Sequence, residues 1–272
     1  MTSSTPVALD AVTTGSGPGL VLIHGTGADA ASNWAPVIDS AADRYTIVAP
    51  NLPGAGATPL PDGPLDLDEL ADRVLATALA AGLHEFHLVG HSIGAVLATA
   101  VAAREPAAVT SLLLHAGWVV TGPRERFVFD LWARLLRTDP ALLARHLVAT
   151  AFGPGLHAAL DDGGFAEIAA GFTALLDERI LPQIDLDTRI DLRAALGAVQ
   201  APTLVLASAD DQIVPSGHQR ELAAGIRSAR YSEVPGGHGL PFEDPARFAA
   251  LVLDFVDASA AAPRNRSEAG VA

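Results

Sequence analysis

Short apolar runs alternate along the chain with longer stretches in which apolar residues recur at helical spacing. The runs are rich in Leu, Val and Ile and are bounded by Gly, Pro, Asn or Asp, which is typical of strands. They predict strands at residues 20–23, 45–49, 86–89, 111–114, 203–207 and 230–234. Helices are predicted at residues 69–81, after Ser92 to about Arg104, and at 246–256. Continuous apolar strands alternating with helices predict an α/β fold, with a mostly parallel central sheet covered by helices on both faces.

The alternation stops between residues 121 and 187. This stretch has helical periodicity, as in RFVFDLWARLLR, and no convincing strand. We expect a helical cap here, inserted after the strand that ends near His115. The predicted division is therefore a core of residues 1–120 and 188–257, a cap of residues 121–187, and a small, polar, disordered tail of residues 258–272.

Composition limits the class of protein and its partners. With 272 residues and 50% hydrophobic residues, the chain is long enough for one large α/β domain or two small ones. A formal net charge of −14 disfavours nucleic acid and anionic membranes as partners. Residues 1–10 lack a signal-peptide pattern, and no apolar run is long enough to span a membrane. We expect a cytoplasmic protein that acts on a small molecule, and the sequence leaves its oligomeric state open.

The absence of two residue types excludes several kinds of chemistry. The chain has no cysteine, which excludes disulfides, thiolate nucleophiles and cysteine-ligated metals. All 17 basic residues are arginine, which excludes Schiff-base lysines and a Walker phosphate loop.

One serine lies between two glycines where a predicted strand meets a predicted helix. In the segment GHSIG, residues 90–94, Ser92 follows the strand at 86–89. Glycine weakens strands and helices, so Gly90 and Gly94 indicate a bend at which the two elements approach closely. The G-x-S-x-G pattern holds a serine hydroxyl exposed above a sheet in this way. We therefore predict that Ser92 is a catalytic nucleophile.

A serine nucleophile needs a base, and the base needs an acid that orients it. Asp210 and Asp211 follow the strand at 203–207, and His238 follows the strand at 230–234 in the loop PGGHGLPF. The carboxyl ends of parallel strands lie at one edge of a sheet, so these side chains should meet Ser92 there. We predict that His238 is the base and that one of the two aspartates is the acid.

Backbone N–H groups are the expected donors to the oxyanion of an acyl-transfer intermediate. Ile93 begins the helix after the nucleophile, and its N–H is the natural first donor. The segment HGTG directly follows the strand at 20–23. It predicts Thr26 N–H as the second donor.

The segments HGTG, PNLPGAGAT, GHSIG, ASADDQIVP and PGGHGLPFEDP together resemble the α/β-hydrolase superfamily in its compact, capped form. The resemblance extends from about residue 7 to residue 256. It implies the order nucleophile, acid, histidine along the chain, favours Asp211 over Asp210 as the acid, and implies neither cofactor nor metal. Asn51 and Thr58 stand where members commonly carry Asp and Ser. That segment is usually structural, so we expect activity to be retained.

Two other functions were weighed. The segment GTGADA, residues 25–30, fits the G-x-G-x-x-A dinucleotide pattern, but Asn51 stands where a ribose-binding carboxylate is expected, and the pattern leaves GHSIG unexplained. A non-catalytic small-molecule-binding protein on the same fold is the second alternative.

The favoured function is a serine hydrolase that cleaves a carboxylic ester, thioester or lactone of an apolar small molecule. The same triad also serves acyltransferases, diketone hydrolases and cofactor-free perhydrolases, and the sequence does not choose among these reactions. Aromatic residues after the strand at 111–114 and in the predicted cap, together with the residue before Ser92, predict the substrate pocket: His91, Trp118, Phe127 and Trp132.

Overall fold

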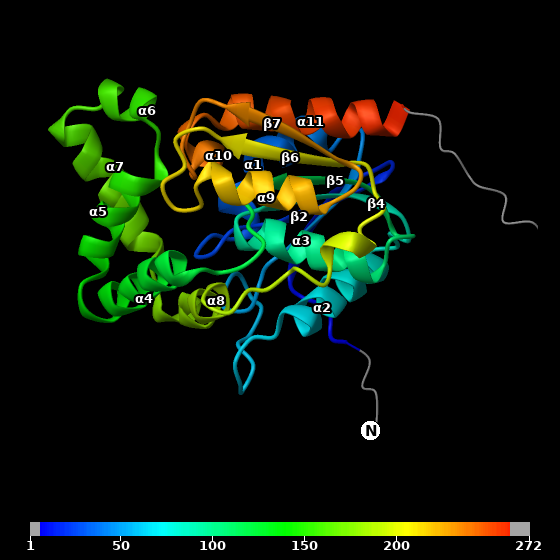
Figure 1. Cartoon of the computed structure of the whole chain (residues 1–272), viewed down its shortest axis with the longest axis horizontal. Coiled ribbons are helices and arrows are strands. Elements are labelled where there is room, and N and C mark those ends of the chain that lie inside the picture. The colour runs from blue at the N-terminus through cyan, green and yellow to red at the C-terminus, as the bar shows by residue number, and fades with distance from the viewer. Residues whose placement is uncertain (1–5, 262–272) are drawn as a thin grey trace, which may run out of the picture.

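The computed structural model describes residues 6–261 and is built around a twisted sheet of seven strands (Figure 1). Their order in the sheet is β1-β3-β2-β4-β5-β6-β7; β1 pairs antiparallel with β3, and all other pairs are parallel. This arrangement confirms the predicted α/β fold. The strands are β1 (Ala11–Gly15), β2 (Gly19–Ile23), β3 (Thr46–Pro50), β4 (Phe86–His91), β5 (Val109–His115), β6 (Thr203–Ser208) and β7 (Ala229–Val234).

Helices cover both faces of the sheet. One face packs against α1 (Ala30–Ala41) and α11 (Pro245–Ala261), with the short α10 (Leu240–Glu243) beside them. The other face packs against α2 (Leu67–Ala80), α3 (Ile93–Arg104) and α9 (Ser216–Gly225), with the 3₁₀ turn η2 (Leu196–Ala198) between α3 and α9.

Several elements of the core differ from the expectation, and helices α9 and α10 are among those not predicted. Strand β1 was not predicted, because its sequence AVTTG is half polar and it lies at the sheet edge. Helix α1 was not predicted, although Asp29 and Ser32 form a capping box at its start. Helix α11 extends to Ala261, beyond the predicted end at residue 256 and into the expected tail; residues 262–272 lie outside the described residues.

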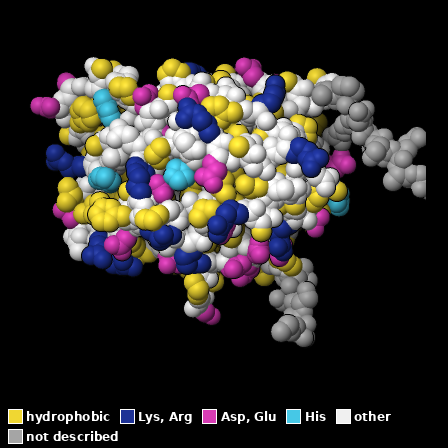
Figure 2. Space-filling model, viewed as in Figure 1, with side chains coloured by type: hydrophobic (Ala, Val, Ile, Leu, Met, Phe, Trp, Pro, Cys, Tyr) yellow, Lys and Arg dark blue, Asp and Glu magenta, His cyan; other side chains and the backbone are white. Residues whose placement is uncertain are grey.

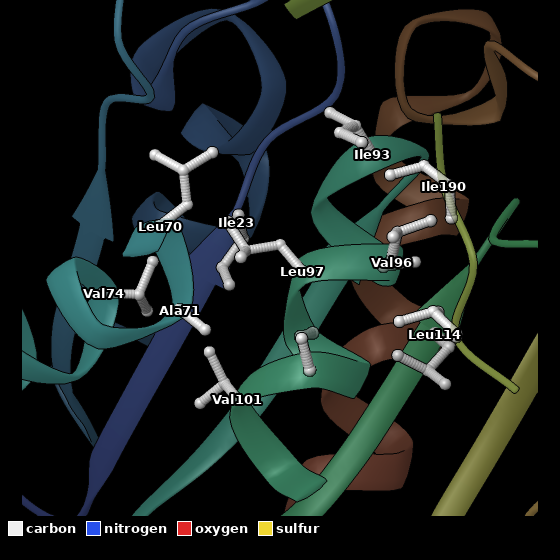
Figure 3. Packing of buried hydrophobic residues seen from close by; sticks show 14 of the residues in the cluster. Ile23, Leu70, Ala71, Val74, Ile93, Val96, Leu97, Val101, Leu114 and Ile190 are labelled. Atoms are coloured by element: carbon white, nitrogen blue, oxygen red, sulfur yellow. The ribbon is translucent and has the colours of Figure 1, made fainter. Parts of the chain in front are cut away.

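The largest apolar cluster lies between the sheet and α2, with α3 at its centre (Figure 3). Val96, Leu97 and Val101 of α3 lie among Ile23 of β2, Leu114 of β5 and the apolar face of α2 in this view. Because α3 is buried on nearly every side, its sequence is apolar except for Thr99 and the terminal Arg104, and it lacks a polar face. This packing holds the start of α3 against the sheet.

The chain between β5 and β6 is helical. Its elements are α4 (Pro123–Thr138), α5 (Pro140–Ala151), α6 (Pro154–Ala159), α7 (Asp162–Leu175), the 3₁₀ turn η1 (Glu178–Ile180) and α8 (Leu181–Asp187). Figure 1 shows α4 to α7 beyond the carboxyl ends of the strands, on the side to which the arrows of β6 and β7 point. We call residues 123–187 the cap.

The surface carries mixed charge. On the face shown in Figure 2, acidic and basic side chains are interspersed with apolar ones rather than gathered by sign. None of the helices within residues 6–261 combines the length and apolarity that crossing a bilayer requires.

Candidate active site

Ser92 lies on a strained bend between β4 and α3. Its φ of 57° and ψ of −124° are in a region that residues with a side chain rarely adopt. A Cβ atom at Gly90 would lie 2.2 Å from the carbonyl oxygen of Gly94, and one at Gly94 would lie 2.1 Å from that of Ile23. Only glycine fits at either position, which explains the G-x-S-x-G spacing.

The structure brings Ser92, His238 and Asp211 into one chain of hydrogen bonds. His238 Nε2 lies 3.0 Å from Ser92 Oγ, and His238 Nδ1 lies 2.9 Å from Asp211 Oδ2. Asp211 Oδ1 accepts the N–H groups of Ile213 and Val214 at 2.9 and 2.8 Å, so both carboxylate oxygens are held. All three triad side chains are buried or nearly so. The arrangement suits proton transfer from serine to histidine.

The neighbouring Asp210 has different contacts. Its Oδ2 lies 3.5 Å from the N–H of Gly236, and within residues 6–261 it makes no hydrogen bond to His238. Of the two candidate acids, Asp211 is therefore the one placed to orient the histidine.

The loop that carries His238 packs against the end of cap helix α5. A Cβ at Gly237 would lie 2.3 Å from the carbonyl oxygen of Ala151, and the N–H of Gly239 donates to that oxygen at 2.7 Å. The carboxylate of Glu243 accepts the N–H groups of Gly237 and Gly153. These glycines allow the close contact that fixes the histidine loop.

The two predicted oxyanion donors lie beside Ser92. The N–H groups of Gly25 and Gly27 donate to Asn33 Oδ1 and Gln183 Oε1, at 2.9 and 3.1 Å. No hydrogen bond among the described residues uses the N–H of Thr26 or Ile93. Thr26 lines the same cavity as Ser92, and Ile93 follows Ser92 in the chain, so the two N–H groups stay the predicted oxyanion donors.

Cap helix α8 holds this loop through two buried side chains that the sequence analysis missed. Gln183 accepts the N–H of Gly27 and donates Nε2–H to the carbonyl oxygen of Pro53 at 2.9 Å. Asp187 Oδ2 accepts the hydroxyl of Thr26 at 2.8 Å. The available signal was a pair of polar residues four apart in LPQIDLD, which lie on one face of a helix.

Burial sets the charge of Asp187. It raises the pKa of this carboxyl well above its usual 3.8, although the hydrogen bond from Thr26 acts in the opposite direction. Asp187 Oδ1 has no hydrogen-bond partner within residues 6–261. Burial therefore favours the neutral form of Asp187, which suits a position beside a site where negative charge develops.

Buried histidines surround the triad in their neutral form. Burial lowers the pKa of His91 far below 6.5 and that of His115 to about 3, with smaller contributions from nearby histidines. His91 Nδ1 lies 2.9 Å from His115 Nδ1, and His115 Nε2 lies 3.0 Å from Ser208 Oγ. The His91 and His238 rings lie 5.2 Å apart. The neutral rings support the triad without adding positive charge beside it.

His24 supports the loop rather than the chemistry. Burial lowers its pKa to about 4, and its Nε2 accepts the N–H of Leu52 at 2.9 Å.

Asn51 and Thr58, which depart from the residues common in the family, also make structural contacts. Asn51 Nδ2 donates to Asp10, and the Thr58 hydroxyl donates to the carbonyl oxygen of Asn51, both at 2.7 Å.

A cavity of about 420 Å³ opens over Ser92 between the core and the cap. His91 and Trp132 line it, together with Thr26, Ser92 and His238. Most of the remaining lining residues are apolar, and those from the cap are Leu143, Leu147, Ala151, Ile168, Gly171, Phe172, Leu175, Ile180 and Ile184. A larger groove of about 920 Å³ between α5 and α7 contains none of the triad residues.

Two of the predicted pocket residues were wrong. Phe127 is 75% exposed, because it lies on the outer face of α4. Trp118 is buried in the core, where it contacts Phe129 and donates to Thr121 Oγ1 at 2.8 Å. Both errors arise because aromatic type alone says neither which face of α4 meets the cavity nor whether the loop after β5 packs into the core.

No group of three or more His, Asp or Glu side chains within residues 6–261 is arranged to hold a metal ion.

Comparison of the sequence with known proteins identifies related chains. The sequence model of the alpha/beta hydrolase family matches residues 20–251. Pyrrolizixenacetamide deacetylase from Xenorhabdus hominickii is 35% identical over 244 residues, which cover 89% of this chain and 92% of that protein.

Two solved structures share the fold. The enol-lactonase from Burkholderia xenovorans LB400 superposes with a TM-score of 0.80 at 24% identity and covers 91% of this chain and 96% of its own. A thermophilic esterase from Thermogutta terrifontis gives a TM-score of 0.79 at 22% identity and covers 92% and 93%.

Proposed function

We propose that this hydrolase, which belongs to the alpha/beta hydrolase family, cleaves a carboxylic ester, thioester or lactone of an apolar small molecule. The proposed reaction uses a Ser-His-Asp triad. The observation that carries the proposal is the hydrogen-bonded chain from Ser92 through His238 to Asp211 at the base of an apolar cavity.

The geometry supports a two-step acyl transfer. His238 Nε2 accepts the proton of Ser92 as its Oγ attacks the acyl carbonyl, while the N–H groups of Thr26 and Ile93 bind the oxyanion. Asp211 accepts the Nδ1–H of His238, which keeps Nε2 free to take the proton. His238 then protonates the leaving group. Water attacks the acyl-enzyme with the same base, which releases the acid and restores Ser92.

The cavity supports an apolar acyl group. Its cap side consists of aliphatic and aromatic side chains, and no Arg, Asp or Glu is among its described lining residues. Transfer of an apolar acyl group from water into this cavity is favourable. An ionic group would lose its hydration there and find no group of opposite charge.

Amide deacetylation is a second candidate. The deacetylase from Xenorhabdus hominickii shares 35% identity over most of both chains. The triad serves amides as well as esters, provided that His238 protonates the departing nitrogen.

The first test needs no knowledge of the natural substrate. A fluorophosphonate reacts only with an activated serine, so intact-mass analysis should show one adduct on the wild type, none on Ser92→Ala, and one on the control Ser40→Ala, whose serine is exposed on α1. A panel of esters, thioesters, lactones and acetamides then follows. Ser92→Ala and His238→Ala should each lower kcat/KM by about 10⁴-fold or more.

The absence of an adduct on folded wild-type protein would contradict the serine mechanism and favour the small-molecule-binding alternative. Labelling without turnover of any member of the panel would favour the acyltransferase, diketone hydrolase and perhydrolase alternatives.

A further inference from the structure

Arg124 connects the cap to the loop that carries the triad acid. It is the second residue of cap helix α4, and its guanidinium donates to two backbone carbonyls of the core. Nη2 donates to the carbonyl oxygen of Gln212, and Nη1 donates to that of Ile213 at 3.2 Å. Gln212 and Ile213 directly follow Asp211 in the chain. A cap residue thus contacts the two residues next to the triad acid.

These two carbonyls belong to the same peptide groups whose N–H groups bind Asp211. The carbonyl of Gln212 and the N–H of Ile213 form one peptide group, and the carbonyl of Ile213 and the N–H of Val214 form the next. Both N–H groups donate to Asp211 Oδ1, at 2.9 and 2.8 Å. Each peptide group therefore links the guanidinium of Arg124, at its oxygen, to the carboxylate of Asp211, at its nitrogen.

This double link affects both geometry and charge. A peptide group is planar and rigid, so a hydrogen bond that holds its oxygen also restricts the direction of its N–H. A positive charge at the oxygen polarises the group and strengthens the hydrogen bond that its N–H donates to an anion. Arg124 therefore aims the two N–H groups at Asp211 and strengthens their hold on its carboxylate.

Buried Glu125 holds the guanidinium in this position. Its side chain is only 4% exposed, and its Oε1 accepts from Arg124 Nη1 at 3.1 Å and lies 3.1 Å from Nε2 of His218 on α9. Burial opposes ionisation of Glu125, but hydrogen bonds from its own N–H, Arg124 and His218 lower its pKa below the usual 4.5. A buried carboxylate thus fixes Arg124 from one side, while the Arg124 side chain is half exposed on the other.

We propose, building on the serine-hydrolase function above, that Arg124 is a positioning residue for the triad acid. Through the two peptide groups between residues 212 and 214 it orients Asp211, and through Asp211 it orients the imidazole of His238. Arg124 is not among the described residues that line the cavity, so it acts through Asp211 rather than on the substrate. The cap therefore contributes to the alignment of the triad as well as to the cavity wall.

Steady-state ester kinetics of Arg124→Ala provide the first test. Water replaces the guanidinium at the two carbonyls, so the N–H groups still reach Asp211 but lose their alignment. We expect kcat to fall by about 10- to 100-fold with KM within about twofold of wild type. Arg124→Lys keeps the charge but not the planar fork that bonds both carbonyls, so it should recover part of the loss. The matched control is Arg134→Ala: Arg134 lies on the same helix, is exposed and pairs with Asp130, and its loss should leave kcat unchanged.

A proton resonance reports the position of Asp211 without any substrate. The Nδ1–H of a histidine that donates to a carboxylate resonates downfield of other N–H protons. Asp211→Asn should remove this signal and thereby assign it to His238. In Arg124→Ala the signal should shift upfield or broaden, as expected for a weaker hydrogen bond, whereas Arg134→Ala should leave it unchanged.

The two measurements separate this proposal from the proposed function. A resonance that depends on Arg124, in a protein that turns over no ester, would refute only the hydrolase proposal. A lower melting temperature of Arg124→Ala, with wild-type kcat and resonance, would confine Arg124 to docking of the cap and overturn its positioning role. If Arg124→Ala does not fold, Arg124→Met decides, since it keeps the unbranched stem without a donor; wild-type kcat and resonance in that variant would equally overturn the role.

Discussion

The cavity over Ser92 has two sides that differ in how they are built. On the core side, Ser92 and His238 line the cavity and follow the ends of β4 and β7, and Asp211, which is hydrogen-bonded to His238, follows the end of β6. The cap side consists of apolar side chains from several helices that pack on one another and on the core loops. Strand ends in one sheet fix their loops relative to each other, whereas the inward face of a cap helix depends on how the whole cap docks.

The core and the cap also differ in how deeply their residues are buried. Nearly every residue of α3, which follows the nucleophile, is buried, whereas α7 of the cap has no fully buried residue. A residue in α3 touches neighbours on all sides, so substitutions there disturb the fold. The residues of α7 are half-buried or exposed, so the cap can vary its lining with less disturbance of the fold.

The largest expected effect tests the core side. Asp211→Asn should lower kcat/KM by about 10³- to 10⁴-fold, because an amide at this position can no longer hold the His238 tautomer that leaves Nε2 free. Asp210→Asn, one residue earlier, should stay within a few-fold of wild type because Asp210 does not contact His238. Steady-state ester kinetics of both variants provide the measurement. The opposite ranking would transfer the acid role to Asp210.

A smaller effect tests the cap side. Gly171 of α7 lines the cavity, and a Cβ atom placed there meets no atom within 4 Å. Gly171→Leu should therefore fill part of the cavity without strain and lower kcat/KM for long acyl esters by about tenfold, with little change for acetyl esters. Phe127→Ala, at an exposed cap position, is the control and should leave the chain-length profile unchanged. A uniform loss across all chain lengths would contradict this role for the cap.

The smallest expected effect tests the contact between the two sides. Burial raises the pKa of Asp187, so this cap residue becomes charged at a higher pH than an ordinary aspartate. Its negative charge next to Thr26 would then repel the oxyanion, and kcat should fall a few-fold as the pH rises through that raised pKa. In Asp187→Asn, which cannot ionise, this fall should disappear while activity near pH 7 is retained.

Few other side chains can account for an alkaline fall. The chain contains no lysine or cysteine, and its two tyrosines, Tyr45 and Tyr231, have pKa values raised to about 12 by burial and by hydrogen bonds to carboxylates. An alkaline fall of equal size in wild type and Asp187→Asn would assign it to another group.

Prediction from the sequence succeeded where a local rule applies. Apolar runs between turn residues marked the buried strands β2 to β6 and hence their loops, because a strand buried on both faces needs mostly apolar side chains. Prediction failed at β1 and α1. An edge strand needs only one apolar face, and α1 contains Pro36 and several polar residues, which weaken the helical pattern.

The fold class and the segments that carry the chemistry could be predicted from the chain alone, because the glycine spacing around Ser92 and the apolar runs before the loops are visible in the sequence. The lining of the cavity could not: that Trp132 lines it while Phe127 faces solvent, and that Gln183 and Asp187 hold the loop of Thr26, is seen only in the folded protein, as is the hydrogen bond from His238 to Asp211. These outcomes depend on side chains distant in sequence, whose proximity arises only when the cap packs on the core.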